Sequence, residues 1–212
     1  QWIFKAGHPD VKATFEWNEE KKQAKFAFTQ QQKPDEWIGI FRFPLMIKLV
    51  TGEHEDFHEL EIDSAEKNFT FVSKEKPKFV SINVGNTILG SWDFNPGRDL
   101  LIAQLKEDKD VMGRVFAART LTKDHSRACV DALGEALERE KFWGVQVEIA
   151  ETLGQIGSAR AQDCLLKNLE RVKHPHARKS IVRALGYFKN EATVEACEKV
   201  LKNDVSPLCQ YE

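Results

Sequence analysis

A repeat of thirty-two residues governs the second half of the sequence. Leu121, Leu153 and Leu185 stand thirty-two residues apart, within the similar phrases AARTLTK, AETLGQI and RALGYF. A fixed period with two apolar helical faces in each unit is typical of stacked helix pairs. The sequence therefore predicts an α-solenoid of HEAT-like repeats. Two further apolar rows keep the same step: Leu105, Leu137, Leu169 and Leu201, and, one helical turn earlier, Leu101, Leu133, Leu165 and Cys197.

Glycine and proline positions predict where the helices of each unit begin and end. Gly154 and Gly186 are expected to close the first helices, because glycine suits a helix C-terminus. Pro175 and Pro207 occupy one phase of the repeat. We therefore expect Pro207 to begin another unit, which the chain interrupts at Glu212 and which leaves one helix face without its neighbour.

The first half of the sequence has a different period. Up to the turn-forming segment Asp93–Gly97, apolar and polar residues alternate with a period of two, and turn signals separate the runs. Such short alternating runs favour an antiparallel β-sandwich over residues 1–97, followed by the helical-repeat domain over residues 98–212. The alternating aromatics are interpreted as core rather than as a ligand platform. The predicted strands contain Val11 to Trp17, Ala24 to Phe28, Leu45 to Leu49, Leu60 to Ile62, Phe69 to Phe71 and Val80 to Val84, with a seventh possible at Thr87 to Trp92.

The pentapeptide His54-Glu55-Asp56-Phe57-His58 fits the H-E-x-x-H pattern of zinc peptidases. That chemistry requires a helix, where two residues four apart reach one ion. Here a strand pattern precedes the motif, Thr51-Gly52 reads as a turn, and a second alternating run follows. Residues four apart in a strand are separated by roughly 13 Å. We therefore interpret the motif as part of a hairpin and predict no metal site there.

Other candidate chemistry is sparse, and we predict no catalytic, cofactor-binding or metal-binding residue. His174-Pro175-His176 is interpreted as a solvated loop, and Lys106–Asp110 as a charged surface loop. Arg114, Gln146 and Arg178 share one repeat phase and are either a concave binding row or, as we favour, a solvated row. The cysteines never form Cys-x-x-Cys, so they read as small buried hydrophobes of a reducing, cytoplasmic compartment. They are Cys129, Cys164, Cys197 and Cys209.

Charge and hydropathy exclude two classes of partner. The 31 Lys plus Arg residues are balanced by 33 Asp plus Glu residues. A nucleic-acid groove needs clustered basic residues, so the sequence predicts no nucleic-acid partner. No run of eighteen apolar residues exists, so no membrane span is predicted. The chain begins with Gln1 rather than Met, which suggests a piece of a longer protein.

Several segments, in their order, carry a resemblance to a known family. They are QWIFKAGHPDVKATFEWNEEKKQAKFAFTQQQ, FRFPLMIKL, KPKFVSINVGNTILGSWDF and LIAQLKEDKDVMGRVFAARTL. The first resembles the start of the β-sandwich that follows the catalytic domain in the aminopeptidase N family of gluzincin zinc metallopeptidases. The last resembles the family's entry into its helical C-terminal domain. The similarity covers roughly Trp2 to Leu121.

The resemblance implies the non-catalytic, C-terminal part of a zinc-dependent aminopeptidase. Zinc, its ligands and the catalytic residues would belong to the parent's missing catalytic domain, which would be the chain's partner, with peptide substrate bound through the parent. The family's third zinc ligand, a glutamate with eighteen residues between it and the second His, would fall at Pro77. Asn83 and Gly90 depart from residues common in the family, and neither carries chemistry.

Three hypotheses follow from the sequence. The first is the accessory part of a zinc aminopeptidase, whose sandwich links the catalytic domain to a helical domain that helps enclose the active site. The second is a protein-interaction module with HEAT-like repeats, from a relative that has lost its zinc site. The third is a small metal-binding unit that uses His54 and His58. We favour the first.

Overall fold

The computed structural model describes residues 6–34 and 37–211, which form two compact units. The first unit spans Gln1–Gln104 and the second Leu105–Glu212. The sequence places the domain boundary a few residues earlier, between Gly97 and Arg98. The difference arises because α1 (Arg98–Glu107) begins in the first unit and ends in the second. Each unit is described separately below.

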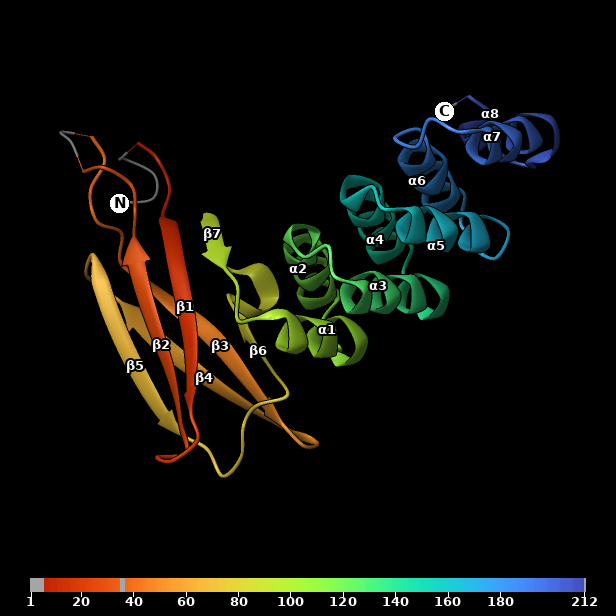
Figure 1. Ribbon diagram of the computed structural model, residues 1–212. Helices are drawn as coiled ribbons and strands as arrows, with labels where there is room; N and C mark the ends of the chain where they lie inside the picture. Colours follow the sequence, from red (N-terminus) through yellow and green to blue (C-terminus); the bar gives the residue numbers. More distant parts are fainter. Residues whose placement is uncertain (1–5, 35–36, 212) are drawn as a thin grey trace. The chain divides into compact units, whose positions relative to one another are not determined.

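The first unit is a two-layer β-sandwich (Figure 1). One sheet has the strand order β5-β2-β1-β7, and the other has the order β4-β3-β6. Neighbouring strands pair antiparallel except β1 and β7, which are parallel. The strands are β1 (Asp10–Asn18), β2 (Gln23–Gln30), β3 (Phe43–Thr51), β4 (His54–Ile62), β5 (Glu66–Val72), β6 (Phe79–Ile82) and β7 (Ser91–Phe94).

Alternation of side chains builds the core of the sandwich. In β2, Ala24, Phe26 and Phe28 point inward and are buried, as the period of two predicts. The Phe28 ring packs edge-on against Phe69 of β5, with centroids 6.1 Å apart. The predicted sandwich is confirmed. Of the alternating aromatics, Phe26 and Phe28 are buried, whereas the others are half-buried: Phe15, Trp17, Phe69 and Phe71. The run predicted to include Val84 ends at Ile82, because the chain turns there into the short helix η1 (Val84–Asn86).

Gln30, at the end of β2, joins the sandwich to the segment before β3. Its amide donates to the Phe41 carbonyl at 2.8 Å and accepts from the Phe41 N–H at 2.9 Å. The side chain thus imitates a strand-to-strand hydrogen-bond pair, and only 6% of the residue is exposed. Buried amides must be paired in this way, which explains a glutamine at this end of the strand.

The second unit is a stack of helix pairs (Figure 1). In chain order the pairs are α2 with α3, α4 with α5, and α6 with α7. Each first helix contacts the first helix of the next pair, and α3 contacts α5. No helix in the described ranges is long and apolar enough to cross a bilayer. The helices are α2 (Val111–Thr120), η2 (Leu121–Lys123), α3 (Arg127–Arg139), α4 (Trp143–Ile156), α5 (Ala159–Leu169), α6 (Pro175–Leu185), α7 (Glu191–Asn203) and α8 (Pro207–Gln210).

The repeated leucines are the core of this stack. Leu121, Leu153 and Leu185 are 0–1% exposed in the first helices. Leu137 of the second helices is equally buried, whereas Leu201 of α7 is 56% exposed. The helical-repeat fold predicted from the period is therefore confirmed. In the row of Leu105, Leu137, Leu169 and Leu201, the last leucine is the least buried.

One glycine has a different role from the one predicted. Gly154 lies inside α4 rather than at its end, and Gly157, with a φ of +66°, closes that helix. A Cβ at Gly154 would lie 2.9 Å from the Ala184 Cβ and 3.1 Å from its Cα. The glycine therefore permits the close approach of α4 and α6. Gly186 does end α6, as predicted.

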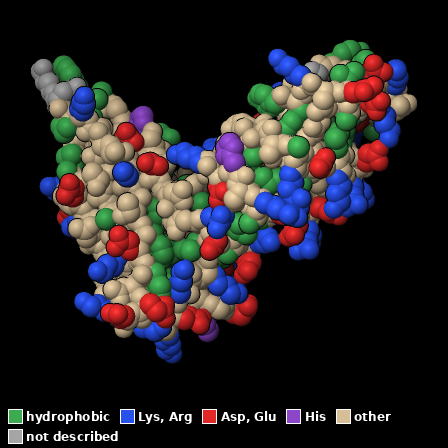
Figure 2. Space-filling view, in the orientation of Figure 1, with side chains coloured by type: hydrophobic (Ala, Val, Ile, Leu, Met, Phe, Trp, Pro, Cys, Tyr) green, Lys and Arg blue, Asp and Glu red, His purple; other side chains and the backbone are tan. Residues whose placement is uncertain are grey.

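Ion pairs connect successive second helices of the stack. Glu138 of α3 pairs with Lys167 of α5 at 3.0 Å, and Asp131 of α3 pairs with Arg160 of α5. Glu170, next to α5, pairs in the same way with Lys199 of α7. Figure 2 shows the result as basic and acidic side chains interspersed along the helical unit. Each pair is exposed, so it contributes little to stability.

A partly buried amide network links α5 to α7. The Gln162 Nε2 donates to Asn190 Oδ1 and to Thr193 Oγ1, each at 2.8 Å. Asn190 Nδ2 donates back to Gln162 Oε1 at 2.9 Å. Asn190 also caps α7 by accepting from the Thr193 N–H. One side chain therefore both begins a helix and joins it to the preceding unit.

Candidate functional site

The H-E-x-x-H pentapeptide lies on strand β4, as the sequence predicts. His54 pairs with Thr51 and His58 with Ile47 in the ladder with β3. His54 is exposed, and the His58 ring packs against Phe71 at 4.3 Å between centroids. Within residues 6–34 and 37–211, no cluster of three or more His, Cys, Asp or Glu side chains is arranged to hold a metal ion.

All four cysteines are free thiols. Cys129 and Cys209 are buried, and Cys164 and Cys197 are half-buried. Burial raises the pKa of the Cys164, Cys197 and Cys209 thiols. A thiol is nucleophilic only as the thiolate, so these side chains act as small apolar groups.

The row of Arg114, Gln146 and Arg178 is not solvated. The Arg114 Nε and Nη2 donate to the two carboxylate oxygens of Glu140 at 2.7 and 3.1 Å. Arg178 holds Asp204 in the same bidentate way, at 2.8 Å for both bonds. The favoured sequence interpretation was wrong, because the side chains turn inward and tie each first helix to the loop that closes its own pair.

Hydrogen bonds determine the charge state of these two carboxylates. Burial alone would raise the pKa of Glu140, but hydrogen bonds from Arg114 and from the Phe142 and Lys141 N–H groups outweigh it, so this pKa is lowered. The hydrogen bonds from Arg178 lower the pKa of Asp204. Both groups are therefore carboxylates at neutral pH, and their charges are satisfied within the protein.

Four rings at the starts of α4 and α6 form a cluster that we term the aromatic edge: Phe142, Trp143, His174 and His176. The Trp143 and His174 rings stack nearly parallel, 10° apart with centroids at 5.0 Å. His176 lies 5.2 Å from Trp143 and 5.6 Å from His174. Phe142 and Trp143 remain 42% and 39% exposed. The segment interpreted as a solvated loop is thus a packed ring stack with an open face.

The local backbone explains how these rings meet. Phe142 is the N-cap of α4 and His174 the N-cap of α6, one repeat apart, and neither side chain caps its helix. The second helices differ, since Ser126, Ser158 and Asn190 all accept a capping hydrogen bond. Sequence reasoning missed Trp143, although the adjacent Phe142, an aromatic at the repeat phase of His174, was a usable signal.

The stacked imidazoles do not chelate a metal in this arrangement. A ring nitrogen presents its lone pair in the ring plane, and two ligands of one zinc ion reach it at about 2 Å. The His174 and His176 rings are 24° from parallel and 5.6 Å apart, so their planes do not converge on one point. The His174 Nδ1 is buried without a hydrogen-bond partner, a further sign that the ring is held by stacking.

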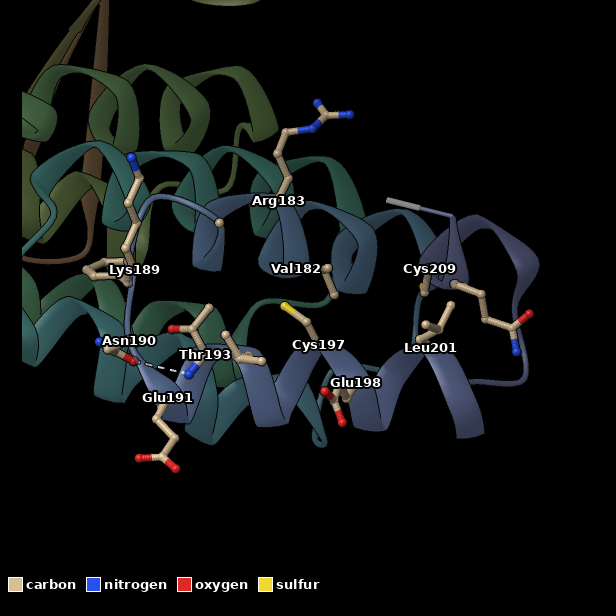
Figure 3. Close-up of a pocket in the computed structure, with 14 residues that line it drawn as sticks. Val182, Arg183, Lys189, Asn190, Glu191, Thr193, Cys197, Glu198, Leu201 and Cys209 are labelled. Atoms are coloured by element: carbon tan, nitrogen blue, oxygen red, sulfur yellow. Dashed lines mark hydrogen bonds between the residues drawn. The ribbon is translucent and has the colours of Figure 1, made fainter.

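A groove of about 910 Å³ lies between α6, α7 and α8. Figure 3 shows Val182 of α6 and Cys197 and Leu201 of α7 pointing into it. Val194 and Leu201 on α7 are each 56% exposed. The groove is apolar along its floor, and its lining brings together no set of catalytic side chains.

The fold and the repeats define a class of protein, a β-sandwich followed by a HEAT-like helical stack. The family model for HEAT repeats matches residues 98–174. No curated protein matches the sequence.

Solved structures that resemble the chain include the following two. The aminopeptidase A of Legionella pneumophila, solved in complex with aspartic acid, is 13% identical and aligns over 99% of this chain with a TM-score of 0.65. The chain spans 31% of that protein's length. Human deoxyhypusine hydroxylase, in complex with glycerol, is 21% identical over 54% of this chain and 40% of its own, with a TM-score of 0.49.

Proposed function

We propose that the chain is the non-catalytic, C-terminal part of a zinc-dependent aminopeptidase that removes N-terminal residues from peptides. The sandwich links the catalytic domain to the helical stack, and the stack helps enclose the active-site cavity. The observation that carries the proposal is the likeness to an aminopeptidase over 99% of this chain, in the order sandwich then helices. The resemblance of the sequence segments to the aminopeptidase N family supports it independently.

The described residues are consistent with an accessory role. His54 and His58 lie on a strand, the thiols are protonated by burial, and the buried carboxylates are held in bidentate pairs with arginine. The parent's zinc would polarise the attacking water, and the helical wall would exclude bulk water and orient the peptide. Parent and peptide substrate are thus the partners of this proposal, and zinc belongs to the parent.

The first experiment reads the coding sequence upstream of Gln1. The proposal expects an H-E-x-x-H motif with a helical pattern and a glutamate after eighteen further residues. Absence of these ligands would reject the peptidase function for the parent. A parallel assay of the purified chain measures its zinc content and its hydrolysis of aminoacyl-coumarin substrates. We expect the purified chain to bind no zinc and to hydrolyse none of these substrates. Stoichiometric zinc that is lost on His58→Ala would contradict the proposal that this part is non-catalytic.

A second experiment tests the enclosing role. The parent and a variant truncated after Gly97 are compared on a series of peptides of increasing length. We expect the truncated, zinc-loaded enzyme to turn over more slowly and to lose its preference for short peptides. An unchanged length profile would leave the helical stack with a stabilising role only.

A protein-interaction module is the second candidate function. The specific observation in its favour is the exposed aromatic edge, which a purely structural wall does not require. It becomes the better proposal if the parent lacks its zinc ligands.

A further inference from the structure

We propose that the aromatic edge, with Lys141 and Lys173, is a docking site for an acidic peptide segment of a partner protein. This role goes beyond the peptidase proposal and does not depend on it. The rings supply the contact area, and the two lysines supply the charge that selects the partner.

The rings are preorganised for binding. Trp143 is fixed by stacking on His174 and by its contact with His176, so little side-chain freedom remains to be lost when a partner binds. Exposed, rigid aromatic side chains supply large contact area at low entropic cost, and tryptophan is enriched among residues that dominate binding energy. Phe142, 5.8 Å from Trp143 and 42% exposed, extends this surface.

The charge of the edge is positive because its acidic neighbours are already paired. Glu140 accepts two bonds from Arg114 and two from backbone N–H groups. Lys141 and Lys173 occupy the same repeat phase, and both are exposed. In the described ranges, neither ammonium group has a carboxylate within ion-pair distance. Both are therefore available to carboxylates from a partner.

The spacing of the lysines defines the peptide. They lie one repeat apart, and neighbouring helices of a stack pack about 8–10 Å from one another. An extended peptide rises about 3.3 Å per residue, so two carboxylates three residues apart match this interval. An aromatic or aliphatic side chain between them would meet the Trp143 ring. The expected partner sequence is Asp/Glu-x-x-Asp/Glu with one large apolar residue inside.

Nucleic acid is the less favoured ligand, although a base could stack on Trp143. Phosphate recognition needs a run of unpaired basic residues, and from Arg98 onward 19 Lys plus Arg residues face 18 Asp plus Glu residues. Several of these basic side chains are already used in pairs between neighbouring helices. The observations therefore favour a peptide with few charges over a polyanion.

The test measures fluorescence polarisation of a labelled peptide, Gly-Asp-Tyr-Gly-Asp-Gly, with the full chain. We expect saturable binding in the high micromolar range, and at least about ten-fold weaker binding when both aspartates are replaced by asparagines. Trp143→Ala should weaken binding by about ten-fold or more. The double variant Lys141→Glu, Lys173→Glu should weaken binding by a similar factor. Because both lysines are exposed, this variant should fold, and it keeps the test valid if Trp143→Ala unfolds.

Matched controls carry the same chemistry away from the edge. Tyr187→Ala removes an exposed aromatic at the opposite end of α6, and Lys123→Glu reverses an exposed lysine beyond the C-terminal end of α2. Each should change binding by less than about two-fold, as peripheral positions do. The proposal is overturned if the peptide does not bind, if the edge variants and the controls behave alike, or if a ten-nucleotide thymidine oligomer binds more tightly than the peptide.

Discussion

Replacing Arg114 with alanine is expected to destabilise the helical unit by about 3 kcal/mol. Arg114 is 15% exposed and Glu140 9% exposed at the side chain, so the pair is largely removed from solvent. The guanidinium also donates from Nη1 to the Asp108 carbonyl at 2.9 Å. Removing one member of such a pair leaves a buried charge unpaired and costs about 3–5 kcal/mol. The lower end of this range applies, because Glu140 still accepts hydrogen bonds from the Lys141 and Phe142 N–H groups in the variant.

The magnitude converts into a measurable thermal shift. The helical unit, Leu105–Glu212, has about 108 residues, and a unit of this size has an unfolding entropy of about 0.23 kcal/mol/K. A loss of about 3 kcal/mol therefore lowers the Tm of this unit by about 13 °C. The assay is thermal unfolding followed by circular dichroism at 222 nm, where the helices dominate the signal.

A matched control lies on the same helix. Arg119 also binds a carboxylate with two hydrogen bonds, to Glu148, but its side chain is 69% exposed. Glu148 is 14% exposed and loses this partner, so Arg119→Ala should cost about 1–2 kcal/mol, less than Arg114→Ala. The reasoning is refuted if Arg114→Ala melts within about 4 °C of the wild type, or if both variants lose the same stability.

Acidification gives a second signature of the same pair. Because the pKa of Glu140 is lowered in the folded state, its contribution is present above its unfolded pKa of about 4.3 and is lost as the pH falls through the folded value. In Arg114→Ala, the hydrogen bonds from Arg114 that lower the pKa of Glu140 are lost. Only the Lys141 and Phe142 N–H groups then oppose the effect of burial, so the pKa of Glu140 rises again. The difference in stability between pH 7 and pH 3 should therefore be smaller in the variant than in the wild type.

Three further outcomes are expected. Gly154→Ala places a methyl group 2.9 Å from the Ala184 Cβ and should lower the free energy of unfolding by about 1–3 kcal/mol; an unchanged melting curve would contradict the close helix contact. Gln30→Leu removes the two hydrogen bonds between the side chain and the Phe41 backbone and should cost about 1–3 kcal/mol in urea unfolding, whereas a neutral result would mean that water replaces the amide. Cys164, whose pKa is raised by burial, should react with a disulfide reagent at pH 8 much more slowly in the native protein than in urea, and equal rates would refute its burial.

Periodicity made most of the fold predictable. The period of two in segments such as Ala24 to Phe28 follows from side chains alternating across a strand, and the thirty-two-residue step of Leu121, Leu153 and Leu185 follows from one helix pair per unit. Both are local signals. The parallel pairing of β1 with β7 was not predictable, because nothing in either segment specifies a partner about seventy residues away.

The candidate site was less predictable, because repeat phase locates a residue without giving its direction. Arg114 and Arg178 were identified as a row, yet the row points inward, since each finds a carboxylate in the loop that precedes the next unit. Trp143 was missed because its partners, His174 and His176, come from the following unit. A sequence pattern shows that positions recur, and only the fold shows which ones touch.

Similarity between repeats also creates a risk during folding, because a helix can dock beside the wrong neighbour of nearly the same sequence. The exposed ion pairs offer little protection against such a shift. Glu138 and Glu170 are alike in phase, and so are Lys167 and Lys199. An arrangement displaced by one whole unit would therefore still find opposite charges facing each other.

The amide network between α5 and α7 does not tolerate that displacement. One unit earlier, the position of Gln162 is Val130, and the position of Thr193 is Ala161. A displaced α7 would place Thr193, which is 4% exposed, beside a valine, and an unpaired buried hydroxyl costs about 1–3 kcal/mol. Gln162 and Thr193 therefore distinguish this junction from its near-copies and favour the correctly ordered stack over misassembled ones.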